Sequence, residues 1–480
     1  MKTYKKTYQT LLVATLLFLG GCKTMQPVQH ASSIKTPQNF DGQTDSTGIA
    51  AMQWKSFFKD PNLIALIDTA LLNNPDLKMA VQRIEMAKSN IFLAKGALLP
   101  AISAEVSGGG RKFGDYTMDG VGNYDTNFSE NIDADRRLPA PFLPDYFVGF
   151  RSSWEIDIWG KLRTQKKAAY TRFLATQAGR NLVVTSLIAQ VSRLYYELLA
   201  MDAELAIIQK NITLQQSAVE NIKIQKEGGR ANELGVRQFT AQLLNTQSLE
   251  IQINQRIVEA ENNLNFLLGR FPQKITRNGR LNENLPERVQ AGIPSKMLIR
   301  RPDIQQAEFE LLANHADLQA ARLAFLPSLN ITGLLGFNAF KGSLLFNPGS
   351  IAYSALGGLA APIFNRKALK AGQKRFEAAS VEALFAYNKA ILTGFQEVST
   401  SLKKIENTKK ISEFKKQEVD VLQLAVVTSR DLFTTGYATY LEIIAAQKNV
   451  LEAELALTEV QKDQHLALVD LYRSLGGGWE

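Results

Sequence analysis

The fold is decided by a stretch that the chain contains twice: PDLKMAVQRIEMAKSNIFLAKGALLPAI at residues 75–102 and PDIQQAEFELLANHADLQAARLAFLPSL at residues 302–329. The two copies align without a gap at an offset of 227 residues, the separation of Pro75 and Pro302. Each opens with Pro-Asp, which suits the first turn of a helix, and each reaches Leu-Pro, where the proline ends the helix. An alternation of apolar and polar residues, typical of a strand, follows in both copies.

The duplication continues along the chain. Asp157–Lys161 matches Pro362–Arg366 at an offset of 205 residues. Three matches share an offset of 207 residues: Gly229 with Gly436, Leu234 with Leu441, and Leu268-Gly269 with Leu475-Gly476. Because the matches keep the same order, they indicate one unit written twice.

Each unit is expected to hold three helices of different length. These are a short helix (75–97 and 302–324), a very long helix (161–226 and 366–433) and a final helix (233–268 and 440–475). At 1.5 Å per residue the long helix spans about 100 Å, and the two shorter ones together nearly match it. The final helix can therefore run back beside the long helix and stack on the short one. A seam of apolar residues at three- and four-residue steps fits such packing: Val184, Leu187, Val191, Leu194 and Leu198.

Two strands are expected in each unit between the short and long helices, at 102–107, 148–158, 328–337 and 351–363. One face of the first carries Ile102, Ala104 and Val106, and serine or glutamate residues alternate with them. A soluble sandwich is one interpretation, but such long helices do not pack around one, and about ten residues suits a tilted membrane strand. Two polar loops, 113–146 and 338–350, join the strands. Four strands cannot close a barrel, so two or three copies must share one.

The N-terminus has the layout of a bacterial secretory signal peptide. Lys2, Lys5 and Lys6 precede the apolar run Leu11–Leu19, and Gly20-Gly21-Cys22 follows at once. Since Cys22 is the only cysteine and directly follows small residues, we expect a signal peptide over 1–21 and lipidation of Cys22. The alternative is an ordinary signal peptide with a chance cysteine. Lys23 in place of aspartate resembles the lipoproteins sorted to the outer membrane.

The composition argues against several classes of protein. The net charge of +9 is spread along the helical segments, so nucleic-acid binding is not expected. The three histidines have no metal-ligand spacing and are expected at the surface: His30, His315 and His465. No Ser-His-Asp pattern or phosphate loop stands out, so no enzyme activity, cofactor or metal is expected. No stretch after the signal peptide is long and apolar enough for a transmembrane helix.

Four motifs resemble the TolC-type outer-membrane efflux protein family, in the lipoprotein branch that includes OprM and NodT. They are Trp54–Leu63 with Asn73–Leu77, Trp154–Gly160, Arg300–Ile304 and Ser474–Trp479. With Cys22 they extend the resemblance over the whole mature chain. It implies an α+β membrane protein, in which long helical hairpins form a periplasmic tunnel. Each chain gives four strands to a 12-stranded barrel that a homotrimer forms in the outer membrane.

The resemblance also implies partners and function. The chain would be a passive conduit for drugs, metals or other small molecules, anchored in outer-membrane lipid and extending into the periplasm. An inner-membrane pump of the resistance-nodulation-division type would deliver the cargo through a periplasmic membrane-fusion adaptor. A conduit for type I protein secretion and a structural coiled-coil envelope lipoprotein are the alternatives.

Candidate site residues follow from the same resemblance. The helical hairpin turns at Gly228-Gly229 and Gly436 would be the periplasmic tips where the adaptor docks. Near the second tip, Leu441 and Phe433 match the apolar and aromatic positions of the periplasmic gate. Thr434 and Ala445 stand where the family has a basic and an acidic residue, so a mainly apolar constriction at Leu441 is expected. Leu441 can equally be an ordinary residue of the coiled-coil seam.

These expectations divide the chain into a signal peptide (1–21), a lipidated extended segment (22–60) and a first repeat (61–270). A linker or equatorial segment (271–300), a second repeat (301–476) and a C-terminal tail (477–480) follow. The identity of the cargo is not readable from the residues.

Overall fold

The computed structural model describes residue 37 and residues 52–134, 136–138, 142–278, 281, 299–364 and 366–479. All of them belong to one contact unit, residues 36–480. The expected signal peptide, the lipidation site Cys22 and residues 282–298 of the expected linker lie outside the described residues.

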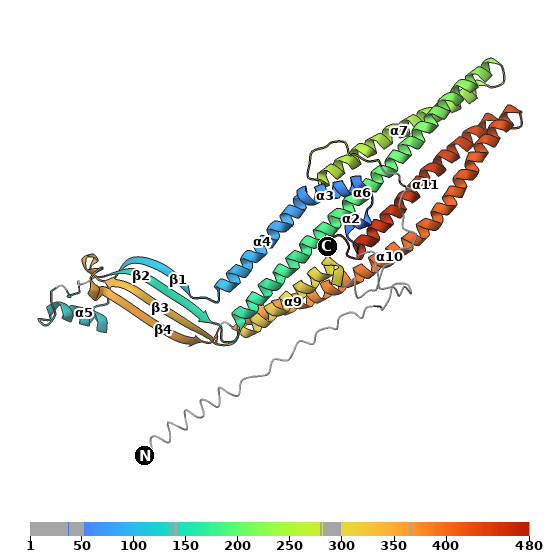
Figure 1. Cartoon of the computed structure of the whole chain (residues 1–480). Coiled ribbons are helices and arrows are strands. Elements are labelled where there is room, and N and C mark those ends of the chain that lie inside the picture. Colours follow the sequence, from blue (N-terminus) through green and yellow to red (C-terminus); the bar gives the residue numbers. More distant parts are fainter. Residues whose placement is uncertain are drawn as a thin grey trace. The chain divides into compact units, whose positions relative to one another are not determined.

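The six helices of the two repeats are confirmed, each to within two residues of its expected ends. The first repeat has α4 (Pro75–Gly96), α6 (Lys161–Glu227) and α7 (Glu233–Leu267), and the second has α9 (Pro302–Leu323), α10 (Arg366–Thr434) and α11 (Tyr440–Ser474). The helix α7 runs back along α6 and α11 along α10, so that two hairpins lie side by side (Figure 1). The short helices α4 and α9 also pack on α6, and α9 packs on α10 as well.

The expected end-to-end stacking of the final helix on the short helix is present in both repeats. In the first, Asn74 Nδ2 donates a hydrogen bond of 2.9 Å to the carbonyl of Leu267, at the end of α7. In the second, the guanidinium of Arg301 donates one of 2.7 Å to the carbonyl of Ser474, at the end of α11. Equivalent positions of the duplication therefore make equivalent joints, although their side chains differ.

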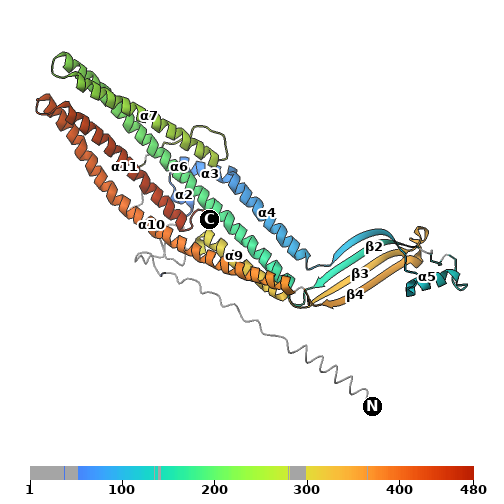
Figure 2. The ribbon, with the colours of Figure 1, turned by 180° about the vertical axis from the view of Figure 1, so that it is seen from behind.

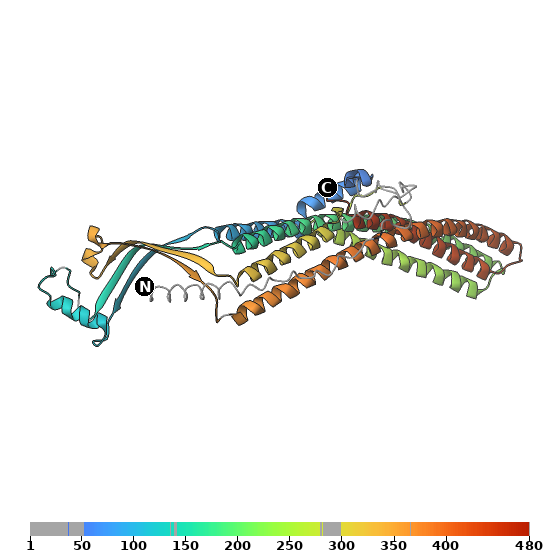
Figure 3. The same cartoon turned by 90° about the horizontal axis from the view of Figure 1, so that it is seen from below.

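The four strands form one antiparallel sheet in the order β1-β2-β3-β4. They are β1 (Ala101–Arg111), β2 (Leu143–Ile156), β3 (Ser328–Ala339) and β4 (Ile351–Ala360). The sheet continues beyond the ends of α4, α6, α9 and α10 instead of packing against their sides (Figure 3). Two strands end earlier than expected, β2 because the side chain of Asp157 caps α6 and β4 because Pro362 interrupts the chain after it, whereas β1 and β3 extend beyond their expected ends.

The expected loop over 113–146 is corrected in part, because it contains the helix α5 (Met118–Phe128). The hydroxyl of Thr117 caps this helix by accepting a hydrogen bond of 3.0 Å from the amide of Gly120. The second loop, 338–350, contains two short 3-10 turns, η2 (Gly342–Leu344) and η3 (Pro348–Ser350).

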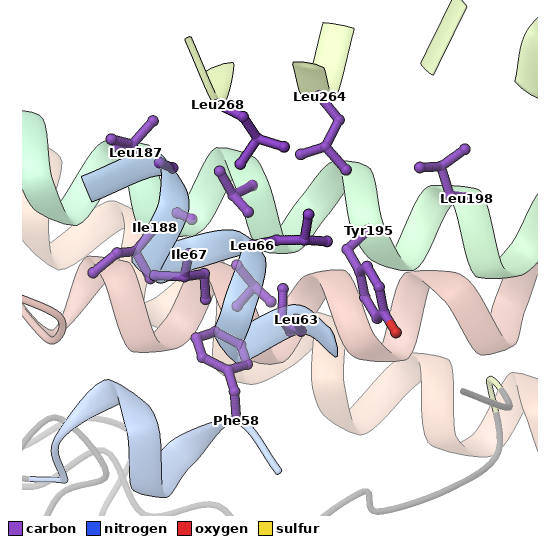
Figure 4. Packing of buried hydrophobic residues seen from close by; sticks show 14 of the residues in the cluster. Phe58, Leu63, Leu66, Ile67, Leu187, Ile188, Tyr195, Leu198, Leu264 and Leu268 are labelled. Atoms are coloured by element: carbon purple, nitrogen blue, oxygen red, sulfur yellow. The ribbon is translucent and has the colours of Figure 1, made fainter. Parts of the chain in front are cut away.

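The largest core lies halfway along α6, where α2 (Trp54–Phe57) and α3 (Pro61–Asn73) cover it. Leu63 and Ile67 of α3 contact the buried seam of α6 near Tyr195 (Figure 4). Residues 54–57 of the expected extended segment are therefore helical, because burial of the Trp54 side chain fixes them on this core.

Two further features bear on function. Among the described residues, no helix is both long and apolar enough to cross a bilayer. The turns of the two hairpins lie next to each other at the end far from the sheet (Figure 2).

Candidate functional site

The sheet has one apolar face that is largely exposed, although Phe346 of the loop after β3 packs on Phe337 at one end of it. Residues directly opposite each other across the strands share this face, as in the row Ala104, Phe150, Leu335 and Tyr353. In that row Phe150 is 56%, Leu335 57% and Tyr353 82% exposed. A contiguous exposed apolar surface marks contact with a membrane or a partner.

The opposite face is polar, as the alternation of the sequence predicts. Arg151 forms an ion pair with Glu105 there, and Lys161, just after β2, pairs with Glu155 at 2.6 Å. The carboxylate of Asp157 accepts hydrogen bonds from the amides of Leu162 and Arg163 at the start of α6. Burial alone would raise the pKa of Asp157, but the bonds from Arg163 and Leu162 outweigh it and lower that pKa. The charges at the helix-proximal end of this face, Arg151, Glu105, Glu155 and Lys161, are therefore paired within the first repeat.

Both edges of the sheet are open. Among the described residues, β1 pairs only with β2, and β4 pairs only with β3. Open edges of this length present unpaired amide and carbonyl groups that another strand can join. The sheet therefore has the form of a wall segment with a free joining edge on each side.

The two hairpin turns have the same backbone geometry. After α6, Gly229 has φ of 71° and Arg230 donates a hydrogen bond of 2.8 Å back to the carbonyl of Gln225. After α10, Gly436 has φ of 83° and Tyr437 donates one of 2.8 Å to the carbonyl of Leu432. Both are Schellman turns, which favour glycine at the left-handed position. The predicted glycine turns are confirmed, and their docking role stays a prediction.

The expected gate residues take different environments. Leu441 is 50% exposed, and Ala445, one turn later on the same side of α11, is exposed too. Thr434 is exposed and its hydroxyl donates a hydrogen bond of 2.8 Å to the carbonyl of Arg430. Phe433 instead packs in the apolar cluster that joins the two hairpins. The structure thus presents Leu441 and Ala445 on one surface and leaves Phe433 half-buried in the neighbouring cluster.

Sequence reasoning missed the centre of that cluster. The ring of Tyr440 lies against Gly235, where a Cβ atom would come within 3.3 Å of it. Its centroid is 6.5 Å from that of Phe239, and the buried Ile443 completes the contact between α7 and α11. The only signal in the sequence is a glycine inside a helical pattern, which indicates a close approach without naming the partner.

A buried cluster of charged side chains connects α9, α10 and α11 of the second repeat, at the level of the main core. Arg301 is 4% exposed and pairs with Asp303 at 2.6 Å and with Glu397 at 2.7 Å. Arg473 binds the other carboxylate oxygen of Glu397 at 2.8 Å. Burial alone would raise the pKa of Glu397, but Arg473 and Arg301 outweigh it and lower that pKa. Sequence reasoning used Arg301 only as part of a motif.

The expectation that all three histidines lie at the surface is wrong for His465. His465 is buried, stacks on the ring of Tyr196 with centroids 4.5 Å apart, and contacts the carbonyl of Leu281. Desolvation lowers the pKa of His465 and so favours its neutral form. Within the described residues, no group of three or more histidine, cysteine or acidic side chains could hold a metal ion.

Comparison with known proteins gives consistent matches over nearly the whole chain. The family described as "Outer membrane efflux protein" matches residues 66–270 and 293–477. The solvent efflux pump outer membrane protein SrpC of Pseudomonas putida is 29% identical, over 98% of both chains. The probable outer membrane lipoprotein SilC of Salmonella typhimurium is 26% identical, over 98% of both chains. The crystal structure of a membrane protein from Pseudomonas aeruginosa has a TM-score of 0.84 at 26% identity, over 95% of this chain and 98% of that one.

Proposed function

Because the chain belongs to the outer membrane efflux protein family, we propose that three copies of it form one continuous conduit across the outer membrane and into the periplasm. The four strands of each copy would supply a third of a closed 12-stranded wall. The helices of the three copies would continue that wall into the periplasm as a tunnel. The conduit itself does no chemistry, and an inner-membrane pump would supply the energy.

The observation that carries this proposal is the sheet with one largely exposed apolar face and two open edges. Such a sheet is not stable alone in water or in lipid, since its edge groups need partners. Pairing β4 of one copy with β1 of the next would satisfy both edges and place the apolar face against lipid. The polar face would then line the lumen.

The helices support the same assembly. The outer side of α7 exposes apolar residues at seven-residue spacing, with Leu244 60%, Ile251 70% and Val258 49% exposed. On α10, Phe414 and Val421 have the same spacing and are 71% and 64% exposed. The helix α7 packs mainly on α6, and the part of α10 that leads to the hairpin turn packs on α11. Each of these helices therefore has a side free for a neighbouring copy.

The remaining contacts follow from this arrangement. Lipid on Cys22 would hold the chain at the outer membrane, because several acyl chains give stable anchoring. A periplasmic adaptor would dock at the tips around Gly228, Gly229 and Gly436 and connect them to a pump of the resistance-nodulation-division type. Drugs, metals or solvents are the proposed cargo. Secretion of a protein through the same tunnel remains the second candidate.

The test combines reconstitution with genetics. The mature chain, purified in detergent, should have the mass of three copies and form channels in planar bilayers. Deletion of the gene should increase the sensitivity of the cells to drugs or metals. A monomer without conductance would contradict the conduit. Loss of one secreted protein with unchanged sensitivity would favour the secretion candidate.

We further propose that Leu441 forms the apolar constriction of the closed tunnel, with Phe433, Thr434 and Ala445 around it. The substitution Leu441→Ser should raise single-channel conductance, because a polar side chain admits water to a constriction that excludes it. Leu234→Ser is the matched control, since Leu234 holds the equivalent place at the first tip and is 58% exposed. Equal conductance of the Leu441 variant and the unchanged protein would contradict this gate.

A further inference from the structure

The first turns of α10 carry an unusual surplus of positive charge. Between residues 366 and 377 there are five cations and one acid, Glu377. Arg366, Lys370 and Lys374 follow at four-residue steps, so they share one side of the helix, and all three are exposed. The first turn of α10 contains no acidic residue. Cations at a helix N-terminus are unfavourable there because of the helix dipole.

The first repeat shows how such charge is neutralised. By the offset of 205, Arg366 corresponds to Lys161, which pairs with Glu155, and Asp157 pairs with Arg163. In the second repeat the positions of these two acids hold Ala360 and Pro362. Within the part of the chain that the structure describes, no ion pair reaches Arg366, Lys370 or Lys374. Arg366 thus keeps the positive charge of Lys161, whereas Lys370 and Lys374 stand where the first repeat has Gln165 and Ala169. The second repeat has more cations on this side of the helix and no acid at the two positions that form ion pairs in the first.

The duplication also indicates the side that these cations face. Glu155 lies on the polar face of the sheet, and Lys161 reaches it, so Lys161 lies on the lumen side. Arg366 takes the equivalent place in the second repeat, and Lys370 and Lys374 continue the same side of α10 away from the sheet. Arg322, in the last turn of the neighbouring α9, adds a further cation close to this level.

From this placement, and on the basis of the proposed trimer, we propose that Arg366, Lys370 and Lys374 of the three copies form an anion-binding ring. The ring lies where the strand wall meets the helical tunnel. Nine unpaired cations around one lumen raise the local concentration of anions. The cargo class that this channel carries best is therefore anionic small molecules, such as carboxylates or phosphates.

The test measures ion selectivity in planar bilayers with a gradient of potassium chloride at low salt. The unchanged channel should prefer chloride, and the triple variant Arg366→Gln, Lys370→Gln, Lys374→Gln should lower the chloride-to-potassium permeability ratio by about tenfold. Inorganic tripolyphosphate, used as a multivalent anion, should block the unchanged channel and block the variant far less. Both differences should shrink in about 1 M salt, where charges are screened.

A matched control replaces three exposed cations far from the sheet, Lys55, Lys59 and Lys78, with glutamine. Its permeability ratio should equal that of the unchanged channel. Lys370→Gln alone should give a smaller shift in the same direction, which guards against misfolding of the triple variant. An unchanged ratio in a conducting triple variant would overturn the ring and leave the conduit intact. Absence of conductance in the unchanged protein would overturn both.

Discussion

Replacing Leu335 with arginine should prevent stable assembly in the outer membrane, whereas the same change at Leu334 should leave assembly intact. Leu335 lies in the middle of β3 between Phe150 and Tyr353 on the apolar face. Its neighbour Leu334 lies between Arg151 and Ser354 on the polar face. The two variants therefore differ only in the side of the sheet to which one charge is added.

The size of the effect follows from the cost of a cation in lipid. An arginine on the lipid face of a barrel costs about 2–4 kcal/mol at the bilayer midplane, so three copies would lose about 6–12 kcal/mol per trimer. On the lumen side the guanidinium stays hydrated and costs little. The expected result is loss of trimers from outer-membrane fractions for Leu335→Arg, with drug sensitivity equal to that of the deletion strain.

The measurement is the yield of trimers on native gels from membrane fractions, with Leu334→Arg as the control. If both variants give the yield of the unchanged protein, the apolar face does not contact lipid. If both lose their trimers, the two faces are not distinguished and the assignment of a polar lumen is wrong.

Much of the architecture could be predicted because it depends on patterns that repeat. Pro75 and Pro302 set the starts of the short helices, and Gly229 and Gly436 set the hairpin turns, since each position has one favoured backbone geometry. The alternation around Leu329 and Ile331 likewise fixes which residues share a face of the sheet.

The features that were missed depend on contacts between distant segments. Gly235 and Tyr440 meet only because the two hairpins lie side by side. The α5 helix was missed because it lies within a polar stretch and its few apolar residues, Met118, Val121, Tyr124 and Phe128, are exposed and contact no core; its start depends on the cap at Thr117. Arg301 is buried because α9, α10 and α11 converge on it, which no local pattern around the residue indicates.

Removing the charge of Arg301 should destabilise the protein more than the other single substitutions in the helices, those of Leu234, Arg237, Lys370 and Leu441. The substitution Arg301→Met keeps the length of the side chain but loses the bonds to Asp303, Glu397 and the carbonyl of Ser474. Breaking a buried ion pair by removing one partner costs about 3–5 kcal/mol, because the other charges stay buried. Arg237→Met is the control, since Arg237 is 77% exposed in its pair with Glu233 and its loss should change the stability little.

The pH dependence of unfolding distinguishes loss of this cluster from a packing defect. Because the folded-state pKa of Glu397 lies below its ordinary value of 4.5, its contribution to stability is present above pH 4.5 and is lost as the pH falls through the folded-state pKa. Arg301→Met should raise that pKa and so flatten the loss of stability on acidification, while Arg237→Met should change the profile far less, because Lys226 remains the main partner that lowers the pKa of the exposed Glu233. Thermal unfolding in detergent, followed from neutral pH to below pH 4, measures both. An Arg301 variant that is less stable but keeps the original pH profile would show that packing, and not the charge cluster, holds this joint.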